Sequence, residues 1–206
     1  MALGELRGRG QDLRQRIARV VQERRAVEQD QISLMRDVLR SVTEGRLHLY
    51  DHIDALPEPQ QPLEGPVPLD TPEAIRTLRT LVNRASEMAA ISEDRRDALI
   101  IAVGEAAANA VMHAREGIGI VGVDPEGIVQ VKVADRGEGI PLEHLPRVLL
   151  EMGYSRAGSG GFGLKIVLKS VDKVHLSTGP EGTTLLLEQN RTPPVPPWVS
   201  YHGLTL

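Results

Sequence analysis

The sequence contains no cysteine among its 206 residues. This absence excludes a disulfide framework, a thiolate metal site and a cysteine nucleophile, and it is typical of a protein from a reducing compartment. The sequence also lacks any stretch of about 18 uninterrupted apolar residues, and its N-terminal segment has no apolar core of the kind that signal peptides carry. The composition therefore predicts a cytoplasmic protein without a membrane partner.

A strong charge of one sign is missing as well. The formal net charge is -4, whereas binding to nucleic acid relies on a concentrated basic surface that neutralises phosphates. Residues 7–46 are rich in arginine, but acidic side chains are interspersed among them, which is the pattern of a solvated helix face. We therefore expect no direct partner among the nucleic acids.

The first part of the chain has an apolar spacing of seven residues. The series consists of Leu6, Leu13, Val20, Val27 and Leu34. Ile17 and Val38 each follow a member of this series by four residues, so the spacing predicts a helix with an apolar seam. Gly10, Arg24 and Gln31 interrupt the second line of the seam, which argues against a long regular coiled coil. We expect residues 1–55 to form a helical extension that packs on the rest of the chain or on a second copy in a homodimer.

Prolines and helix signals divide the rest of the chain. The segment from Leu56 to Pro72 carries six prolines, Pro72 included. Prolines remove backbone donors and disfavour helix, so residues 56–70 are interpreted as a linker. Thr71 followed by Pro72 predicts a helix start with a capping hydroxyl. A second helix, a hairpin, two short helices and two further strands follow up to about residue 190, and residues 191–206 form a proline-rich tail. This order predicts an α+β fold with helices on one face of a mostly antiparallel sheet.

Three motifs inside residues 71–190 carry possible chemistry. In EAAANAVMHA, Glu105 and Asn109 are four residues apart, so a helix presents them on one stripe. An asparagine oxygen suits Mg²⁺, which prefers a few hard oxygen ligands beside water and phosphate. Glu105 could then accept a proton beside the terminal phosphate. Taken alone, this pair is also compatible with ordinary helix packing.

The second motif, DRGEGI, places Asp135 where a strand meets a glycine-flanked turn. A carboxylate there can accept a hydrogen bond from the exocyclic amine of adenine, whereas guanine presents a carbonyl at that edge. Gly137 and Gly139 would let the chain turn beneath the base. An ordinary loop between a strand and a helix would also explain these residues.

The third motif is the glycine-rich run that ends in GGFGL and leads into a helix. Free backbone N–H groups at a helix start favour phosphate, and Arg156 and Lys165 could add positive charge. Gly182, Thr183 and Thr184 could place a hydroxyl near the base or simply turn a hairpin. A flexible surface loop would be the ordinary interpretation of the glycines.

Together and in this order, EAAANAVMHA, DRGEGI, GGFGL and GTT resemble the N box, G1 box, G2 box and closing strand motif of the Bergerat-fold ATPases. These include gyrase, histidine kinases, mismatch-repair ATPases and anti-sigma serine kinases. The resemblance covers residues 71–189 and implies a two-layer sandwich that binds ATP and Mg²⁺. It implies that Glu105 is the catalytic base and Asn109 the Mg²⁺ ligand. The other nucleotide-binding residues that it implies are Asp135, Gly137, Gly139, Ile140, Arg156, Gly161, Gly163, Leu164 and Thr183.

Within that superfamily, the short domain and the short distance from Asp135 to the second glycine box make the chain most similar to anti-sigma and switch serine kinases. This resemblance implies phosphorylation of a serine or threonine on a regulatory partner, a STAS-type anti-anti-sigma protein or a sigma factor. A histidine kinase is the alternative, with His48 or His52 as phosphoacceptor, although neither histidine precedes the usual acidic residue. A module that binds ATP and sequesters a partner without phosphotransfer is the third possibility.

Overall fold

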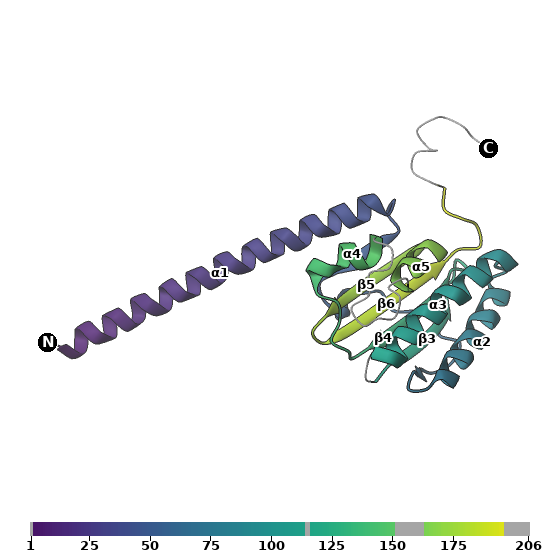
Figure 1. Cartoon of the computed structure of the whole chain (residues 1–206), viewed down its shortest axis with the longest axis horizontal. Coiled ribbons are helices and arrows are strands. Elements are labelled where there is room, and N and C mark those ends of the chain that lie inside the picture. The colour runs from purple at the N-terminus through teal and green to yellow at the C-terminus, as the bar shows by residue number, and fades with distance from the viewer. Residues whose placement is uncertain (1, 114–115, 151–162, 196–206) are drawn as a thin grey trace, which may run out of the picture. The chain divides into compact units, whose positions relative to one another are not determined.

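The computed structural model describes residues 2–113, 116–150 and 163–195. The chain divides into two compact units, Met1–Val38 and Leu39–Leu206. The second unit contains the sheet and the helices that cover it (Figure 1). None of the described helices is both long enough and apolar enough to span a lipid bilayer.

Helix α1 spans Ala2–Val42, and it ends in a defined backbone motif. Glu44 adopts a left-handed conformation with φ 55°, and its N–H donates to the carbonyl of Ser41. The N–H of Gly45, whose φ is also positive, donates to the carbonyl of Arg40 at 2.8 Å. This pair of hydrogen bonds is the Schellman arrangement, which satisfies the last carbonyls of a helix and turns the chain away from its axis.

A six-stranded sheet forms the centre of the second unit, in the order β1-β5-β6-β4-β3-β2. The strands are β1 (Leu47–Tyr50), β2 (Val67–Pro68), β3 (Ile118–Val123), β4 (Val129–Asp135), β5 (Lys173–Gly179) and β6 (Gly182–Gln189). Only the β1–β5 pair is parallel, and the other pairs are antiparallel. The predicted α+β class, the β3–β4 hairpin and the last two strands are therefore confirmed.

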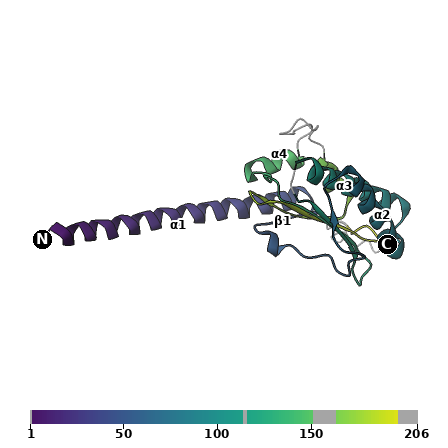
Figure 2. The same cartoon turned by 90° about the horizontal axis from the view of Figure 1, so that it is seen from below.

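The helices of the second unit lie on one face of this sheet (Figure 2). They are α2 (Pro72–Met88), α3 (Glu93–His113), α4 (Leu145–Leu150) and α5 (Gly163–Ser170). The unit also contains short 3-10 turns at Ile53–Ala55 and Leu142–His144. Alternate strand residues point to this face and form the core with the helices; Val131, Val133, Leu176 and Leu187 are at most 3% exposed. The predicted two-layer arrangement is confirmed.

The start of α2 differs from the sequence prediction in one detail. Pro72 is the first helical residue, as predicted, but the Thr71 hydroxyl makes no capping hydrogen bond. The carbonyl of Thr71 instead accepts the N–H of Ala74 at 3.1 Å. An N–H that the hydroxyl could cap is thereby already paired, and the proline fixes a helical φ at the first position, so the helix starts without the hydroxyl.

Contacts at the start of α3 fix the direction of that helix over the sheet. The side chain of Gln189, at the end of β6, donates to the carbonyl of Arg95 at 3.0 Å, and the Arg95 guanidinium donates to the carbonyl of Asn190 at 3.0 Å. Arg95 also pairs with Asp172 at 2.5 Å. The N-terminal turn of α3 is thus held at the end of β6, and its C-terminal half extends toward the start of β6.

The structure also includes segments that the sequence interpretation assigned to the extension and the linker. Strand β1 lies within residues 1–55 and pairs with β5, from Leu47 opposite Val174 to Tyr50 opposite Ser177. Strand β2 lies within residues 56–70, and Pro62 forms an isolated bridge with Gly122. The backbone of Gln60 lies so close to Gly122 that a Cβ there would be 2.2 Å from its carbonyl oxygen.

Candidate functional site

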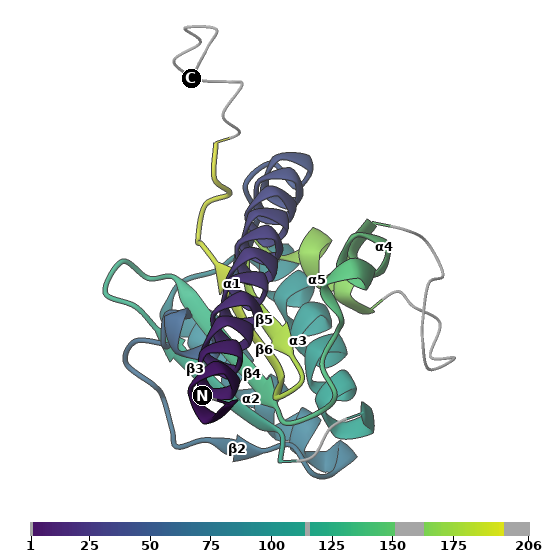
Figure 3. The ribbon, with the colours of Figure 1, turned by 90° about the vertical axis from the view of Figure 1, so that its left-hand side faces the viewer.

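Helix α5 begins at Gly163, beside the polar pair on α3. A Cβ atom built on Gly163 would lie 3.2 Å from Glu105 Oε2 and 3.2 Å from Asn109 Nδ2. Glu105 and Asn109 are half-buried and follow one another by a helical turn, so both project toward the start of α5. The first motif and the glycine that opens the last helix therefore meet at one place, where α3 and α5 pack together (Figure 3).

Asp135 ends β4 and holds two backbone segments through one carboxylate oxygen. Its Oδ1 accepts the N–H of Gly137 at 2.8 Å and the N–H of Thr183 at 3.3 Å. Thr183 lies directly opposite Asp135 in the β4–β6 pair. Next to it, Gly182 has φ 129°, and a Cβ there would lie 1.9 Å from the Asp135 carbonyl oxygen. The turn after β4 and the start of β6 are therefore locked together around one carboxylate.

The rest of the DRGEGI loop rests on the β5–β6 hairpin. Gly139 has φ 65°, and a Cβ at this position would lie 2.0 Å from the carbonyl oxygen of Gly179. The N–H of Ile140 donates to Thr178 Oγ1 at 2.7 Å, and that oxygen lies 2.9 Å from Thr183 Oγ1. Sequence reasoning missed Thr178, because its place opposite Thr183 is known only once β5 and β6 are paired.

The residues around Gly163 and the residues around Asp135 occupy the same end of the sandwich. Asp135, Thr178 and Thr183 each lie two residues along their strand from a core residue that faces the helices. Because every second residue of a strand points to the same side, all three lie on the covered face of the sheet. The C-terminal half of α3 extends toward this end. A Cβ on Gly117, which directly precedes β3, would lie 3.3 Å from Ala110 Cβ, one residue after Asn109.

Two predicted residues, Arg156 and Gly161, lie outside the described residues. Leu164 is 8% exposed and belongs to the packed side of α5. Lys165, which the sequence suggested as a source of positive charge, donates through Nζ to the carbonyl of Leu150 at 2.9 Å. This bond ties the start of α5 to the end of α4.

The arrangement combines groups that suit a phosphorylated ligand. A carboxylate and an amide lie beside the N-terminus of a helix, whose unpaired N–H groups favour anions. At the same end of the sheet, a carboxylate directly precedes a glycine turn, and three hydrogen bonds fix this turn and the start of β6. A carboxylate in this position can accept hydrogen bonds from a ligand as well as from the backbone, because it has about four lone-pair sites.

A second polar cluster lies on the opposite face of the sheet and includes one of the histidines singled out from the sequence. His48 is in strand β1, not at a helix end, and its ring stacks on that of His175 with centroids 5.1 Å apart. His175 Nδ1 lies 2.9 Å from the Tyr50 hydroxyl, and its Nε2 lies 3.6 Å from Glu188 Oε2. Gln130 donates to Glu188 Oε1 at 3.0 Å.

Burial and neighbouring groups shift the pKa values of this cluster. The His175 ring first, and then the Gln130 amide, hold the pKa of Glu188 at about 2 against the opposing effect of burial. Burial lowers the pKa of His48 and raises that of Tyr50. The cluster therefore holds a carboxylate in its ionised form inside the protein, away from the residues that the motifs identify.

A family profile described as "Histidine kinase-like ATPase domain" matches residues 69–188, which is more than half of the chain. No curated protein matches the chain. Among solved structures, the chain is similar to the RsbU and RsbW domains of Rv1364c from Mycobacterium tuberculosis, with 20% identity over 62% of this chain and 32% of that chain and a TM-score of 0.43.

The chain is also similar to the histidine kinase domain of a blue-light activated histidine kinase from Erythrobacter litoralis EL346, with 18% identity over 59% of this chain and 60% of that chain and a TM-score of 0.37. For the mycobacterial sensor histidine kinase MprB, the identity is 20% over 62% of this chain and 99% of that chain, and the TM-score is 0.39. The matched part thus spans about a third of the chain that holds the RsbU and RsbW domains and three fifths of the Erythrobacter histidine kinase domain.

Proposed function

This chain belongs to the histidine kinase-like ATPase domain family, and from that premise we propose that it is an ATP-dependent protein kinase that phosphorylates a serine or threonine of a regulatory partner. The observation that carries the proposal is the contact of Gly163 with Glu105 and Asn109. It supports the proposal because a carboxylate, a side-chain amide and the N-terminus of α5 lie together, which suits the terminal phosphates of ATP and a Mg²⁺ ion.

The residues present also fit a magnesium ion. Asn109 is half-buried, and its Oδ1 lies 3.7 Å from the Cβ position of Gly163 at the start of α5. This neutral oxygen would hold Mg²⁺ together with phosphate oxygens and water, which is the small protein contribution that Mg²⁺ sites use. When bound, the ion would neutralise charge on the β- and γ-phosphates.

The fixed loop after β4 supports the choice of adenine. The backbone around Asp135 is held by Gly137, Thr183 and the Ile140–Thr178 bond, so the carboxylate keeps one position. In our proposal the Asp135 carboxylate accepts a hydrogen bond from the exocyclic amine of adenine. The carbonyl of guanine would bring an acceptor against an acceptor at the same edge.

In the proposed reaction, the hydroxyl oxygen of the partner's serine or threonine forms a bond to the γ-phosphorus of ATP. The bond from that phosphorus to the bridging oxygen breaks, and ADP leaves with the electron pair. Glu105 accepts the hydroxyl proton. Positioning by α3 and α5 and charge neutralisation would supply most of the catalysis, because the phosphoryl transition state demands little covalent chemistry from the protein.

We propose a STAS-type anti-anti-sigma protein or a sigma factor as the partner, on the strength of the motif resemblance to anti-sigma and switch serine kinases. We also include a homodimer in this proposal, because the first unit carries the apolar seven-residue spacing.

The test of phosphotransfer incubates the chain with γ-labelled ATP, with and without a STAS-type protein or a sigma factor, and then treats the labelled protein with acid. Acid-stable label on the partner is expected. Acid-labile label on this chain would replace the proposal with a histidine kinase, and clear ATP binding without any label would replace it with sequestration.

Glu105→Gln tests the role of the base within that assay. The substitution keeps the shape of the side chain but removes the proton acceptor, so Mg-ATP binding should persist while single-turnover transfer falls about a hundredfold. Glu93→Gln is the matched control, since Glu93 lies on the same helix with an 80% exposed side chain. Transfer within a few fold of wild type in Glu105→Gln would make Glu105 a packing residue of the helix.

A further inference from the structure

Helix α1 carries a row of exposed apolar side chains. Ile17, Val20, Val27 and Leu34 are 55%, 55%, 56% and 66% exposed. We call the row the α1 seam; it consists of Ile17, Val20, Val21, Val27, Leu34 and Val38. Apolar side chains that form a stripe along an otherwise polar helix mark a surface that is buried in an interaction.

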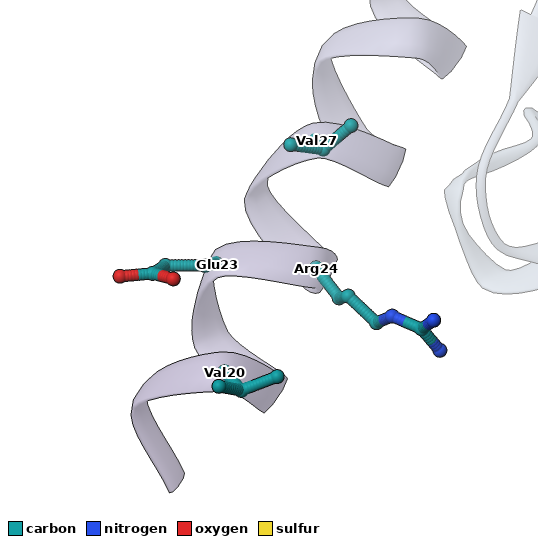
Figure 4. Close-up of a pocket in the computed structure, with 4 residues that line it drawn as sticks. All are labelled: Val20, Glu23, Arg24 and Val27. Carbon is teal, nitrogen blue, oxygen red and sulfur yellow. The ribbon is translucent and has the colours of Figure 1, made fainter. Parts of the chain in front are cut away.

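The geometry of the seam fits another helix. Val20 and Val27 lie above one another on α1, with Glu23 on one side and Arg24 on the other (Figure 4). A shallow hollow lies between these four side chains. Residues that repeat every seven positions and are flanked by charges form the knobs and holes by which two helices pack side by side.

We propose that the α1 seam binds the α1 seam of a second copy of this chain, with the two helices antiparallel and centred near residue 22. The proposal specifies the contact in the homodimer included above, but the experiments below measure association and not phosphotransfer. The pairing of α1 and the proposed phosphotransfer can therefore fail independently of one another.

Helix length and apolar pairing select this register. When the pair is centred near residue 22, Ala2 faces Val42 of the second copy, so the two helices overlap along their whole length. Ile17 then packs against Val27 of the second copy, and the two copies of Val21 meet beside the twofold axis. A register shifted by seven residues in either direction shortens this overlap.

The charges that flank the seam are complementary in this register. Arg16 lies at the level of Asp30 of the second copy, and by symmetry the contact occurs twice. The two copies of Glu23 approach one another, but each already pairs with Arg19 of its own chain at 2.9 Å. Opposite charges at such flanking positions set the orientation of paired helices.

A parallel pair lacks these advantages. It would place Arg24 against Arg24 in the middle of the seam, since identical residues then face one another. In the antiparallel pair Arg24 faces Val20 of the second copy, where its aliphatic stem can cover the valine while its guanidinium reaches water. The interruption of the seam at residue 24 therefore favours the antiparallel orientation.

The first test measures the association of the full chain by sedimentation velocity. We expect a dimer, and we expect Arg16→Asp or Asp30→Arg alone to weaken association about tenfold, because each change replaces two attractive contacts with two repulsive ones. The double variant R16D/D30R should restore association close to the wild-type level. Gln22→Glu, on the outer face of α1, is the control and should change little. A monomeric wild-type chain, or single variants that associate like wild type, would overturn the proposal.

The second test reads the orientation directly. The chain has no cysteine, so an introduced thiol is the only one present. Under oxidation, Val21→Cys should form a disulfide-linked dimer. A mixture of Ile17→Cys and a size-tagged Val27→Cys should yield the mixed product, and Ile17→Cys alone should yield little dimer. Efficient linkage of Ile17→Cys to itself, or no linkage of Val21→Cys in a chain that sediments as a dimer, would rule out the antiparallel pair.

Discussion

Asp135 shows how one side chain can serve both the fold and the proposed ligand. Its Oδ1 accepts N–H groups from Gly137 and Thr183, which lie on two different segments of the chain. Removing the carboxylate altogether would therefore disturb the loop as well as any base contact. A substitution that retains one oxygen separates these two roles.

Asp135→Asn is that substitution. The asparagine oxygen can still accept the backbone N–H groups, so the protein should remain folded. Its amide nitrogen would then present a donor to the adenine amine, and we expect ATP affinity to fall about ten- to a hundredfold, as expected for a lost hydrogen bond to a charged group. Calorimetric titration with ATP measures the change, and the melting curve checks the fold. Unchanged ATP affinity in the folded variant would remove Asp135 from the base site.

Glu188 is the residue whose ionisation the fold controls most clearly. Contact with His175, and then the hydrogen bond from Gln130, lowers its pKa from the ordinary value of 4.5 to about 2. A carboxylate with a depressed pKa stabilises the folded state above the unfolded pKa. This stabilisation is lost as the pH falls from about 4.5 through about 2.

Glu188→Gln should remove that pH dependence. The glutamine can still accept a hydrogen bond from Gln130 but carries no charge beside His175 or Lys173, which lies 3.5 Å from Glu188 Oε2. We expect the variant to be less stable than wild type by about 1–2 kcal/mol at neutral pH, with a smaller difference near pH 2. Urea unfolding at several pH values measures both differences. A difference that stays constant across the acid range would show that the charge of Glu188 does not matter.

At the scale of elements, Gly139 joins the loop after β4 to the β5–β6 hairpin. It has φ 65° and lies against the Gly179 carbonyl, so Gly139→Ala carries both a backbone cost and a steric clash. Gly127 is the matched control: its φ is 82°, and nothing lies within 4 Å of its Cβ position. We expect Gly127→Ala to cost about 1 kcal/mol, which is the backbone cost alone.

Gly139→Ala should cost about 2–4 kcal/mol and should also weaken ATP binding, because the loop that holds Asp135 must move. Urea unfolding and ATP titration of both variants provide the comparison. Equal losses of stability in the two variants would mean that the hairpin yields to the added methyl group, and that the loop is less fixed than its contacts indicate.

Local patterns predicted most of the elements but fewer of their contacts. The alternation in GIGIVGVD and GIVQVKVAD identified β3 and β4, and helical spacing identified α2 and α3. Strand β1 was not predicted, because four residues after a long helix show little periodicity and their partner β5 lies far along the chain. The prediction of a capping hydroxyl at Thr71 was wrong, since the carbonyl of Thr71 already accepts the N–H of Ala74.

For the candidate site too, the sequence predicted individual residues better than the contacts between them. Glu105 and Asn109 share a stripe because a helix places residues four apart on one face, which a sequence alone can indicate. Their contact with Gly163 depends on how α5 packs against α3, and no local pattern encodes that packing. Thr178 likewise depends on strand register. The assignment of Asn109 to Mg²⁺ and of Asp135 to adenine remains a prediction.

At the scale of the whole molecule, the boundary between the two compact units falls at Val38, well before β1. A chain that lacks residues 1–38 retains Leu39, which is 1% exposed, and the strand Leu47–Tyr50. We expect this shortened chain to fold and to bind ATP like the full chain, because the core and the candidate site lie within the second unit. Calorimetry and melting curves test this, and loss of ATP binding would show that the first unit contributes to the site.

A chain that lacks residues 1–50 is the informative comparison. It would lose β1, uncover the edge of β5 and remove Tyr50 and His48 from His175. We expect a clear loss of stability relative to the chain that lacks residues 1–38. Equal stability of the two shortened chains would show that β1 is dispensable.

The other edge of the sheet has a consequence for solubility. Strand β2 is only two residues long, and one of them is Pro68, which has no N–H to donate. An edge strand with a full row of free donors and acceptors can pair with the edge of another molecule and start aggregation. A short strand that contains proline has few free backbone donors and acceptors, so the strand of another molecule has little to pair with at this edge.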